Sequence, residues 1–383
     1  MKIVFFRSEE VNYLNGEFSS SSSYIRWLEN ISNQFSEVVS INPCMGLEPR
    51  KKVKCKRNLY IKPLPKLNGY LNPIINIYNI IKSINDEKNA DYIILRIPDH
   101  ANIILLFFLP FFIKKEKIVF WVVGNRMQIA KSSIKYDSMY LLKYLTNYFI
   151  DFFEQLFLMI YPSLVNGSEA YHHSKSIHGS AISNNDANQF ISTNLDNESA
   201  PVIRYLGRLT REKNIETFIK SVPFVNDPNV TFELIGRTPD QAYLDELKSL
   251  IPNNHKARVS FKNEITYGDQ LFLTYATSYL IVQPSLTEGA SRTILESMAF
   301  NIPVIASDIK ANRYLIDKEN KISLTFEAGN HEDLAKKINS CTQNKELYNN
   351  MRSNLSKESF MYNDQIAKEI KNFLVSLGLQ GGK

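Results

Sequence analysis

The sequence predicts an α/β protein with two domains, each built on a mostly parallel sheet with helices on its faces. The chain has 383 residues, which is long for one hydrophobic core and sufficient for two. Short apolar runs alternate with helical stretches from residue 2 to about residue 191, and again from about residue 202. Between these blocks, residues 178–200 are mostly polar and predict an interdomain linker.

The composition is that of a globular protein, with 44% hydrophobic and 22% charged residues. A net charge of +6 and 12% aromatic residues suit an acidic membrane surface, or simply anionic nucleotide ligands. The basic run at residues 50–57 is typical of a solvated loop or edge strand, and no motif supports nucleic-acid binding. Cys44, Cys55 and Cys341 have no metal-type spacing, which favours a reducing, cytoplasmic location.

The first block begins with a buried strand, because its N-terminal apolar stretch is too short for a signal peptide. The expected strands of this block are residues 3–6, 38–41, 92–95, 118–123 and 164–165. Gly16 and the serine run 19–23 follow the first strand. Serine hydroxyls cap helices and bind phosphate, but such a run equally suits a flexible surface loop.

Two segments of the first block are unusually apolar. Residues 103–113 fall well short of the roughly 20 residues that a membrane span needs. Lysines 114, 115 and 117 close this run, so a membrane-interface segment and a buried helix both remain open. Residues 139–160 have helical periodicity and predict a helix packed on the sheet, with a membrane-facing or acceptor-facing surface as the second interpretation.

The clearest pattern of the second block is strand, glycine loop, helix and strand at residues 279–308. Apolar residues recur at helical spacing from 294 to 299, and Asn301 followed by Pro303 predicts the helix end. Such a unit points the free N–H groups of a helix N-terminus at the carboxyl edge of a parallel sheet, which favours an anion. Glu288 and Glu296 suit a polyhydroxylated ligand, because an ionised carboxylate only accepts hydrogen bonds. Together these features predict a nucleotide-sugar site.

Glu288 and Glu296 have seven residues between them and stand in the context Pro-Ser-Leu-Thr-Glu-Gly and Leu-Glu-Ser-Met-Ala. This stretch resembles the E-x7-E signature of the family-4 retaining glycosyltransferases, also called glycosyl transferases group 1. Residues 203–214 resemble the G-R-L-x-x-E-K motif of the same family. The resemblance is strong from about residue 202 to 338 and weak before it. The alternative is structural: Thr293 and Glu296 form a capping box, and Glu288 is a loop carboxylate.

The resemblance implies the GT-B fold, with two doubly wound Rossmann-like domains facing a central cleft. Residues 1–195 would form the N-terminal acceptor-binding domain and residues 196–360 the C-terminal nucleotide-sugar-binding domain. Residues 361–383 would be a helix that crosses back to the N-terminal domain.

The resemblance also assigns roles around the donor. Glu288 would bind the hydroxyls of the donor sugar and Glu296 those of the ribose. Arg208 and Lys213 would bind the diphosphate, because two cations at a helix start oppose the helix dipole unless an anion joins them. Backbone groups of four residues would approach the ligand closely: Gly207, Gly236, Gly289 and Ala290.

Two residues of the first domain are further candidates. By resemblance, Gly16 would line the cleft. His100 follows an expected strand end, where α/β enzymes keep their chemistry, and is either a proton carrier for the acceptor hydroxyl or a helix N-terminal residue without chemistry.

The implied activity is a retaining glycosyltransferase of the hexosyltransferase type. It would transfer a sugar from a nucleoside diphosphate sugar, with UDP-sugar favoured, to a glycan or lipid-linked glycan in the synthesis of lipopolysaccharide or capsule. The donor is a co-substrate, and no essential metal, bound cofactor or nucleic-acid partner is expected. The expected location is cytoplasmic, with peripheral contact to the membrane. Two rivals stay open: a catalytically silent nucleotide-sugar-binding scaffold subunit, and a GT-B nucleotide-sugar epimerase.

Overall fold

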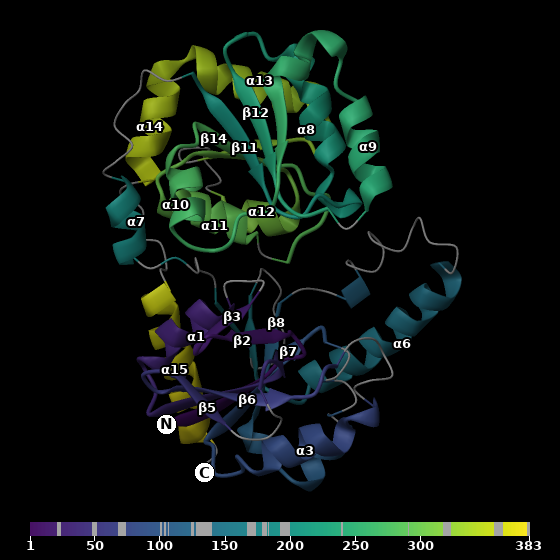
Figure 1. Cartoon of the computed structure of the whole chain (residues 1–383), viewed down its shortest axis with the longest axis vertical. Coiled ribbons are helices and arrows are strands. Elements are labelled where there is room, and N and C mark those ends of the chain that lie inside the picture. Colours follow the sequence, from purple (N-terminus) through teal and green to yellow (C-terminus); the bar gives the residue numbers. More distant parts are fainter. Residues whose placement is uncertain are drawn as a thin grey trace. The chain divides into compact units, whose positions relative to one another are not determined.

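A computed structural model describes the chain in two compact units (Figure 1). The first unit comprises residues 1–178 and 363–383, and the second unit comprises residues 179–362. The described residues are 1–20, 24–47, 52–67, 74–99, 102, 105, 107–123, 126–127, 140–166, 174–177, 182, 184–191, 200–238, 240–289, 291–316, 323–355 and 363–380.

The first unit contains a mixed sheet with a parallel centre. Its strands are β1 (Lys2–Phe6), β2 (Val11–Leu14), β3 (Glu17–Ser20), β4 (Glu37–Met45), β5 (Val53–Lys56), β6 (Leu59–Leu64), β7 (Tyr92–Ile97), β8 (Ile118–Val122), β9 (Ser163–Val165) and β10 (Ser174–Ser176). Its helices are α1 (Tyr24–Ser32), α3 (Ile77–Asn85), α6 (Tyr140–Leu158) and α15 (Asn363–Gln380), with the short 3-10 helices η1 (Leu109–Phe111) and η2 (Lys115–Lys117).

The order of these strands is β10-β9-β8-β7-β1-β4, with β6 and the β2–β3 hairpin on the far side of β4. All neighbours from β10 to β4 pair in parallel. Because β1 lies between β4 and β7, the chain runs first to one side of β1 and then to the other. This is a doubly wound sheet, and the five strands expected from the sequence are confirmed.

The sequence pattern missed the β2–β3 hairpin. Asn15 and Gly16 form its two-residue turn, both with positive φ, as a primed hairpin turn requires. Gly16 is therefore accounted for by the turn itself, and its role at a cleft stays a prediction.

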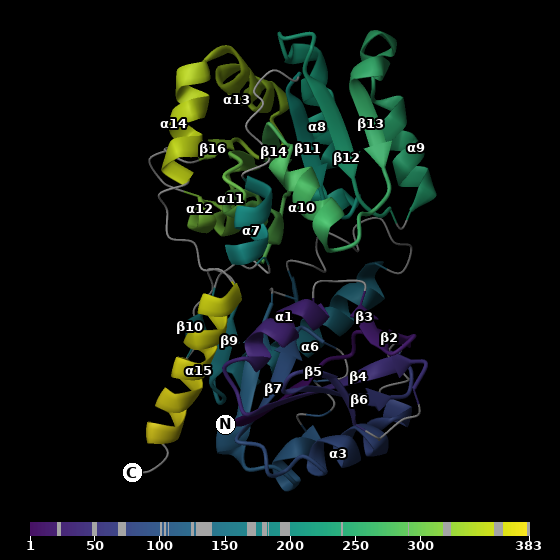
Figure 2. The same ribbon diagram turned by 60° about the vertical axis from the view of Figure 1, so that its left-hand side comes forward.

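Helix α15 returns the chain to the first unit. Leu374 of α15 is fully buried, and its carbonyl accepts a 2.7 Å hydrogen bond from the hydroxyl of Tyr92 in β7. An ion pair of 3.2 Å between Glu369 and Lys175 joins α15 to β10, and Figure 2 shows α15 running beside β9 and β10.

The second unit has a wholly parallel sheet. Its strands are β11 (Val202–Leu206), β12 (Thr231–Ile235), β13 (Val259–Lys262), β14 (Leu280–Gln283), β15 (Val304–Ser307) and β16 (Ser323–Phe326). Its helices are α7 (Asn184–Ile191), α8 (Ile215–Ser221), α9 (Gln241–Ser249), α10 (Asp269–Ala276), α11 (Arg292–Ala299), α12 (Lys310–Leu315), α13 (His331–Gln343) and α14 (Lys345–Leu355), with the 3-10 helices η3 (Arg211–Lys213), η4 (Val222–Phe224) and η5 (Asn253–Arg258).

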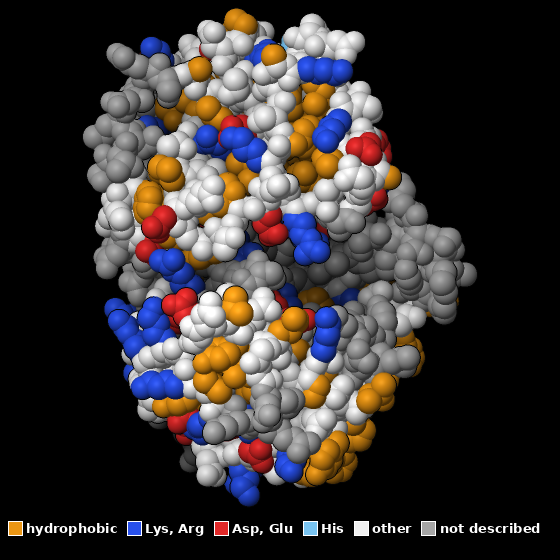
Figure 3. Space-filling model, viewed as in Figure 1, with side chains coloured by type: hydrophobic (Ala, Val, Ile, Leu, Met, Phe, Trp, Pro, Cys, Tyr) orange, Lys and Arg blue, Asp and Glu red, His pale blue; other side chains and the backbone are white. Residues whose placement is uncertain are grey.

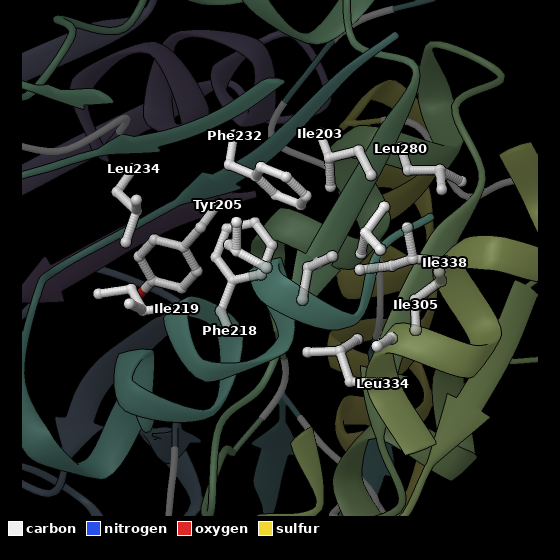
Figure 4. Close-up of a cluster of buried hydrophobic side chains, with 14 of the residues drawn as sticks. Ile203, Tyr205, Phe218, Ile219, Phe232, Leu234, Leu280, Ile305, Leu334 and Ile338 are labelled. Atoms are coloured by element: carbon white, nitrogen blue, oxygen red, sulfur yellow. The ribbon is translucent and has the colours of Figure 1, made fainter. Parts of the chain in front are cut away.

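The strand order of this sheet is β13-β12-β11-β14-β15-β16, and every neighbouring pair is parallel. Successive strands are therefore added on one side of β11 up to β13 and on the other side from β14 onward. Open α/β sheets bind ligands at such a reversal of strand order, here between β11 and β14. On one face of the sheet a core of fully buried side chains, among them Phe218, Phe232 and Leu334, joins the strands to α8 and α13 (Figure 4). Burial on both faces explains the nearly continuous apolar runs of these strands.

Part of the predicted linker is a helix. The sequence prediction assigns residues 178–200 to a polar connection and ends the first domain at residue 195, whereas α7 lies in the second unit. Ala187 is fully buried, and the ring of Phe190 lies 5.8 Å from that of Phe272 in α10. Ala187, Phe190 and Ile191 pack against the same core, and these three apolar residues are enough to anchor a helix whose overall composition is polar.

Neither interpretation of residues 103–113 holds alone. Leu105, Leu109 and Ile113 are buried, whereas Phe107, Phe108, Phe111 and Phe112 are exposed. The described helices include none that is both long enough and apolar enough to span a membrane.

Candidate functional site

The candidate site lies at the carboxyl ends of β11 and β14 in the second unit. These two strands are neighbours at the point where the strand order reverses. The loop after β11 contains Gly207, Arg208 and Lys213, and the loop after β14 contains Glu288 and Gly289. The topology therefore brings the two sequence motifs to one edge of one sheet.

Glu288 is held by side chains from both loops. The ammonium group of Lys213 lies 2.6 Å from Oε1 of Glu288. Gln283 Nε2 and Ser285 Oγ donate hydrogen bonds of 2.6 and 2.7 Å to the same oxygen. Among the residues that the structure describes, none donates a hydrogen bond to Oε2, so this oxygen is left to accept from a ligand.

The two loops are also joined through their backbones. The amide of Leu286 donates a 3.0 Å hydrogen bond to the carbonyl of Glu212. Asn214, which has a left-handed φ of 51°, donates from its side-chain amide to the carbonyl of Pro284 at 3.3 Å. These bonds fix the loop after β11 against the loop after β14 and hold Lys213 beside Glu288.

The glycines of this edge allow a close approach of backbones. A Cβ atom on Gly236 would lie 1.8 Å from the carbonyl oxygen of Gly207, and one on Gly207 would lie 2.9 Å from the hydroxyl of Tyr205. That hydroxyl donates a 2.7 Å hydrogen bond to the carbonyl of Arg208. Burial raises the pKa of Tyr205 well above its ordinary value, and the negative charge of Glu288 adds to this rise.

Arg208 extends away from these contacts. Its side chain is 65% exposed, and its guanidinium lies 3.4 Å from the carboxylate of Glu212. It is therefore available to an incoming anion at small cost, because an exposed ion pair contributes little stability.

Glu296 lies inside α11 and is buried. Its Oε2 accepts a 2.8 Å hydrogen bond from the hydroxyl of Tyr275 in α10. Burial raises the pKa of Glu296, while the charge of Arg292 and the Tyr275 hydrogen bond act against this rise. The tertiary contact with Tyr275 could not be predicted from the local sequence pattern.

The capping-box alternative for Thr293 and Glu296 is wrong. The N-cap of α11 is Ser291, whose Oγ accepts from the amide of Ile294 at 3.4 Å. Thr293 donates instead to the carbonyl of Leu206 at 3.0 Å, so the start of α11 is tied to the end of β11. Asn301 follows the helix with a left-handed φ of 58°, and the predicted helix end is confirmed.

A pocket of about 440 Å³ lies beside Gly236, at the ends of β12 and β13. Its lining includes Leu209, Arg237, Phe261, Lys262 and Asn263. Apolar, polar and charged residues from the ends of three strands and from α9 therefore surround a space at the same edge as Lys213 and Glu288.

Not all predicted residues can be placed at this site. His100 and Ala290 lie outside the described residues, and Gly16 belongs to the first unit. In the described ranges, no group of three or more His, Cys, Asp or Glu side chains is arranged to hold a metal ion.

Sequence reasoning missed Gln283 and Ser285, which position Glu288, and Tyr275, which holds Glu296. Gln283 and Ser285 carry a local signal, because they are polar residues at the end of a buried apolar strand. Tyr275 carries none, since a tyrosine on an amphipathic helix most often belongs to the core.

Comparison with solved structures shows the fold. Sucrose-phosphate synthase from Thermosynechococcus elongatus is 15% identical and superposes with a TM-score of 0.73 over 99% of each chain. HepE from Anabaena in complex with UDP-glucose is 14% identical, with a TM-score of 0.69 over 98% of this chain and 100% of that one. The chain has the GT-B fold that the sequence predicts.

Comparison with curated sequences gives shorter matches. The O-antigen chain mannosyltransferase RfbU of Salmonella typhimurium is 34% identical over 97 residues, which is 25% of this chain and 27% of RfbU. Residues 186–358, nearly all of the second unit, match the family model described as glycosyl transferases group 1. The second unit is therefore similar to glycosyl transferases group 1, and the chain spans about a quarter of the length of the curated relative that it matches.

Proposed function

We propose that this protein is a retaining glycosyltransferase that moves a hexose from a nucleoside diphosphate sugar, with UDP-sugar favoured, to a glycan or lipid-linked glycan. The observation that carries the proposal is the contact between Lys213 and Glu288. It joins a cation suited to a diphosphate and a carboxylate suited to sugar hydroxyls at the ligand-binding edge of a doubly wound sheet.

The charges at this edge match the needs of the reaction. As the nucleoside diphosphate leaves, negative charge grows on its oxygens and the sugar becomes oxocarbenium-like. Lys213, the exposed Arg208 and the amide of Gly289 supply positive potential for the leaving group. Glu288 Oε2 accepts from a donor hydroxyl, and the diphosphate itself takes the acceptor proton, as the family resemblance implies.

The pocket beside Gly236 suits the nucleoside. Its 440 Å³ is sufficient for a base and ribose, and backbone groups at the strand ends can hydrogen-bond to the edge of a base. The complex of HepE with UDP-glucose supports a UDP-sugar as the donor.

The acceptor side of the proposal is a cell-surface polysaccharide. RfbU, the relative named above, is an O-antigen chain mannosyltransferase, and this name supports a role in lipopolysaccharide synthesis.

Helix α6 supports peripheral contact with the cytoplasmic face of the membrane. Between residues 144 and 160 none of the exposed side chains is charged: they are Leu145, Thr146, Tyr148, Phe149, Phe152, Leu156, Met159 and Ile160. The carboxylate of Glu154 instead points inward, where it accepts hydrogen bonds of 2.8 and 2.9 Å from Arg126. Such an inverted polarity is unfavourable in water and favourable against lipid.

The ring of Phe107 lies 5.4 Å from that of Phe153, so the apolar surface continues from α6 to the exposed phenylalanines within and beside η1. Hydrophobic side chains gather along this edge of the first unit in Figure 3. Lys114 and Lys115 follow at its border, where they suit anionic headgroups.

The test is donor binding and turnover by the full chain, with Lys213→Met and Glu288→Gln as site variants. Each is expected to weaken UDP-sugar binding by roughly tenfold or more, because a charged hydrogen bond is lost. Lys220→Met and Glu246→Gln are matched controls on exposed parts of the second unit and are expected to bind as the wild type. An NMR spectrum of the product should show the anomeric configuration of the donor.

The rivals predict different results. Tight donor binding without transfer to any glycan would favour the scaffold subunit. Conversion of the donor sugar without an acceptor would favour the epimerase. If both site variants bind the donor like the wild type, the site assignment is wrong.

A further inference from the structure

The first unit has its own point of strand-order reversal, between β1 and β7. Phe6, the last residue of β1, pairs with Leu95 of β7. One position further along the two parallel strands stand Arg7 and Arg96. Residues at matching positions of paired parallel strands point to the same face, so two arginines lie side by side at the edge where such sheets bind ligands.

The same face carries an aromatic cluster under α1. The guanidinium of Arg7 lies 4.5 Å above the ring of Tyr24 in α1. Trp121 of β8 pairs in register with Arg96 and stacks on Trp27 of α1 at 4.1 Å, with an interplanar angle of 21°. These are the only two tryptophans of the chain, and both remain partly exposed.

The two arginines differ in how their charges are balanced. Arg7 forms an ion pair with Glu9. Asp99 accepts hydrogen bonds from the amide and hydroxyl of Ser8, at 3.2 and 2.6 Å. The guanidinium of Arg96 forms no hydrogen bond or ion pair with any residue that the structure describes, although Asp99 and Glu9 are near enough to act on its charge.

The surroundings of Arg96 disfavour its positive charge. Burial, together with the positive charge of Arg7, lowers the pKa of Arg96 to about 10, because Asp99 and Glu9 only partly oppose these effects. A guanidinium stays protonated at neutral pH all the same. The cost of a partly buried charge without a partner is therefore retained in the free protein, and a bound anion would relieve it.

We infer that Arg96, with Arg7 beside it, binds an anionic group of the acceptor, namely a phosphate or a carboxylate on the sugar, next to the Trp27–Trp121 pair. The planar guanidinium matches both anions through two parallel hydrogen bonds, and the indoles offer an apolar surface to the sugar ring. This inference rests on the proposed function, because it names the chemical class of the acceptor. The donor diphosphate is assigned to the second unit and does not compete for this site.

The test is binding of three probes to the full-length protein in saturating UDP: glucose 1-phosphate, glucuronic acid and glucose. The wild type should bind at least one anionic probe roughly tenfold or more tighter than glucose, and Arg96→Gln should lose this preference. Arg96→Lys should recover part of it, because the charge returns without the planar fork. Arg57→Gln, on the turn between β5 and β6, is the matched control and should bind like the wild type.

Thermal unfolding without ligand separates a binding role from a structural one. Arg96→Gln should unfold at the same temperature as the wild type or higher, because it removes an unpaired charge. A lower unfolding temperature together with unchanged probe binding would overturn the inference, as would equal binding of glucose and both anionic probes. A preference for glucose 1-phosphate identifies a phosphorylated acceptor, and one for glucuronic acid identifies a uronate.

Failure of the proposed function gives a different pattern. If UDP and UDP-sugars do not bind but the anionic probes still require Arg96, the glycosyltransferase proposal fails and the anion site stands. If UDP-sugar binds and is turned over while Arg96→Gln leaves probe binding unchanged, only the assignment of the anion site is wrong.

Discussion

At residue 236 the second unit has room for a hydrogen atom and nothing larger. A Cβ there would lie 1.8 Å from the carbonyl oxygen of Gly207, which is backbone and cannot rotate away. By contrast, a Cβ on Gly16 would meet no atom within 4 Å, and only its positive φ favours glycine. Residue 236 therefore requires glycine because there is no space for a side chain, and residue 16 favours glycine because of its backbone conformation.

We predict that Gly236→Ala destabilises the second unit by an amount near the upper end of the ~1–3 kcal/mol that overpacking costs. Gly16→Ala should cost about 1–2 kcal/mol, because only the left-handed strain remains. Urea unfolding of both variants measures the difference. Equal losses would mean that the loop after β11 moves away from residue 236 without cost.

Glu296 links the site to the dependence of stability on pH. Burial raises its pKa in the folded protein above the ordinary value of 4.5. The folded state then holds this proton more tightly than the unfolded state. The contribution of Glu296 to the free energy of unfolding is therefore greatest below pH 4.5 and falls as the pH rises through the folded-state pKa.

Glu296→Gln should remove this dependence and still accept the hydrogen bond from Tyr275. Relative to the wild type, the variant should become progressively more stable as the pH rises above 4.5, while its affinity for the donor falls if the carboxylate binds the ribose. Chemical unfolding across this pH range checks the first part, and titration with UDP checks the second. Parallel stability curves for the two proteins would contradict the role given to burial.

At the scale of elements, α6 shows how tertiary contacts change the meaning of a sequence pattern. Its periodicity predicts a helix, which is confirmed. A helix on a soluble sheet usually turns its apolar face inward. Here Phe149 and Phe152 are 65% and 59% exposed, and the charge of Glu154 is turned inward to Arg126.

We predict that Phe149→Ser combined with Phe152→Ser lowers binding to anionic phosphatidylglycerol vesicles by about tenfold or more, because two aromatic side chains no longer enter the lipid. Phe224→Ser combined with Leu273→Ser removes comparable exposed side chains from the second unit and serves as the control. Vesicle co-sedimentation measures both. Equal binding of the two double variants would argue against a membrane role for α6.

At the scale of the whole molecule, the two units share no sheet, and each has a hydrophobic core of its own. The core of the first unit is completed by α15, and that of the second unit by α8 and α13. Each core can therefore unfold with its own midpoint.

Leu374→Ala should lower the free energy of unfolding of the first unit by about 2–5 kcal/mol, because it leaves a cavity under α15. The second unit should unfold as in the wild type. Leu334→Ala is the matched change in the second unit, since both leucines are fully buried. Calorimetry with and without UDP-sugar assigns the transitions, because a donor should raise only that of the second unit. A single transition shifted equally by both substitutions would show that the units unfold together.

Local sequence patterns are sufficient to predict much of the second unit. The strand and helix of residues 279–308, the left-handed Asn301 and the loops with Arg208, Lys213 and Glu288 follow from signals within about ten residues. Backbone conformation and hydrophobic period act over that range, so the pattern of one segment suffices. The family resemblance came from the same local motifs.

The tertiary structure brings together residues that are far apart in the sequence. Lys213 contacts Glu288, which lies 75 residues further along the chain, and Tyr275 donates a hydrogen bond to Glu296. Arg96 lies beside Arg7 at the end of the neighbouring strand. The tertiary structure also turned part of a polar linker into α7 and the apolar face of α6 outward. These outcomes depend on which distant surfaces bury each other, and the free energy of that burial belongs to no single segment of the sequence.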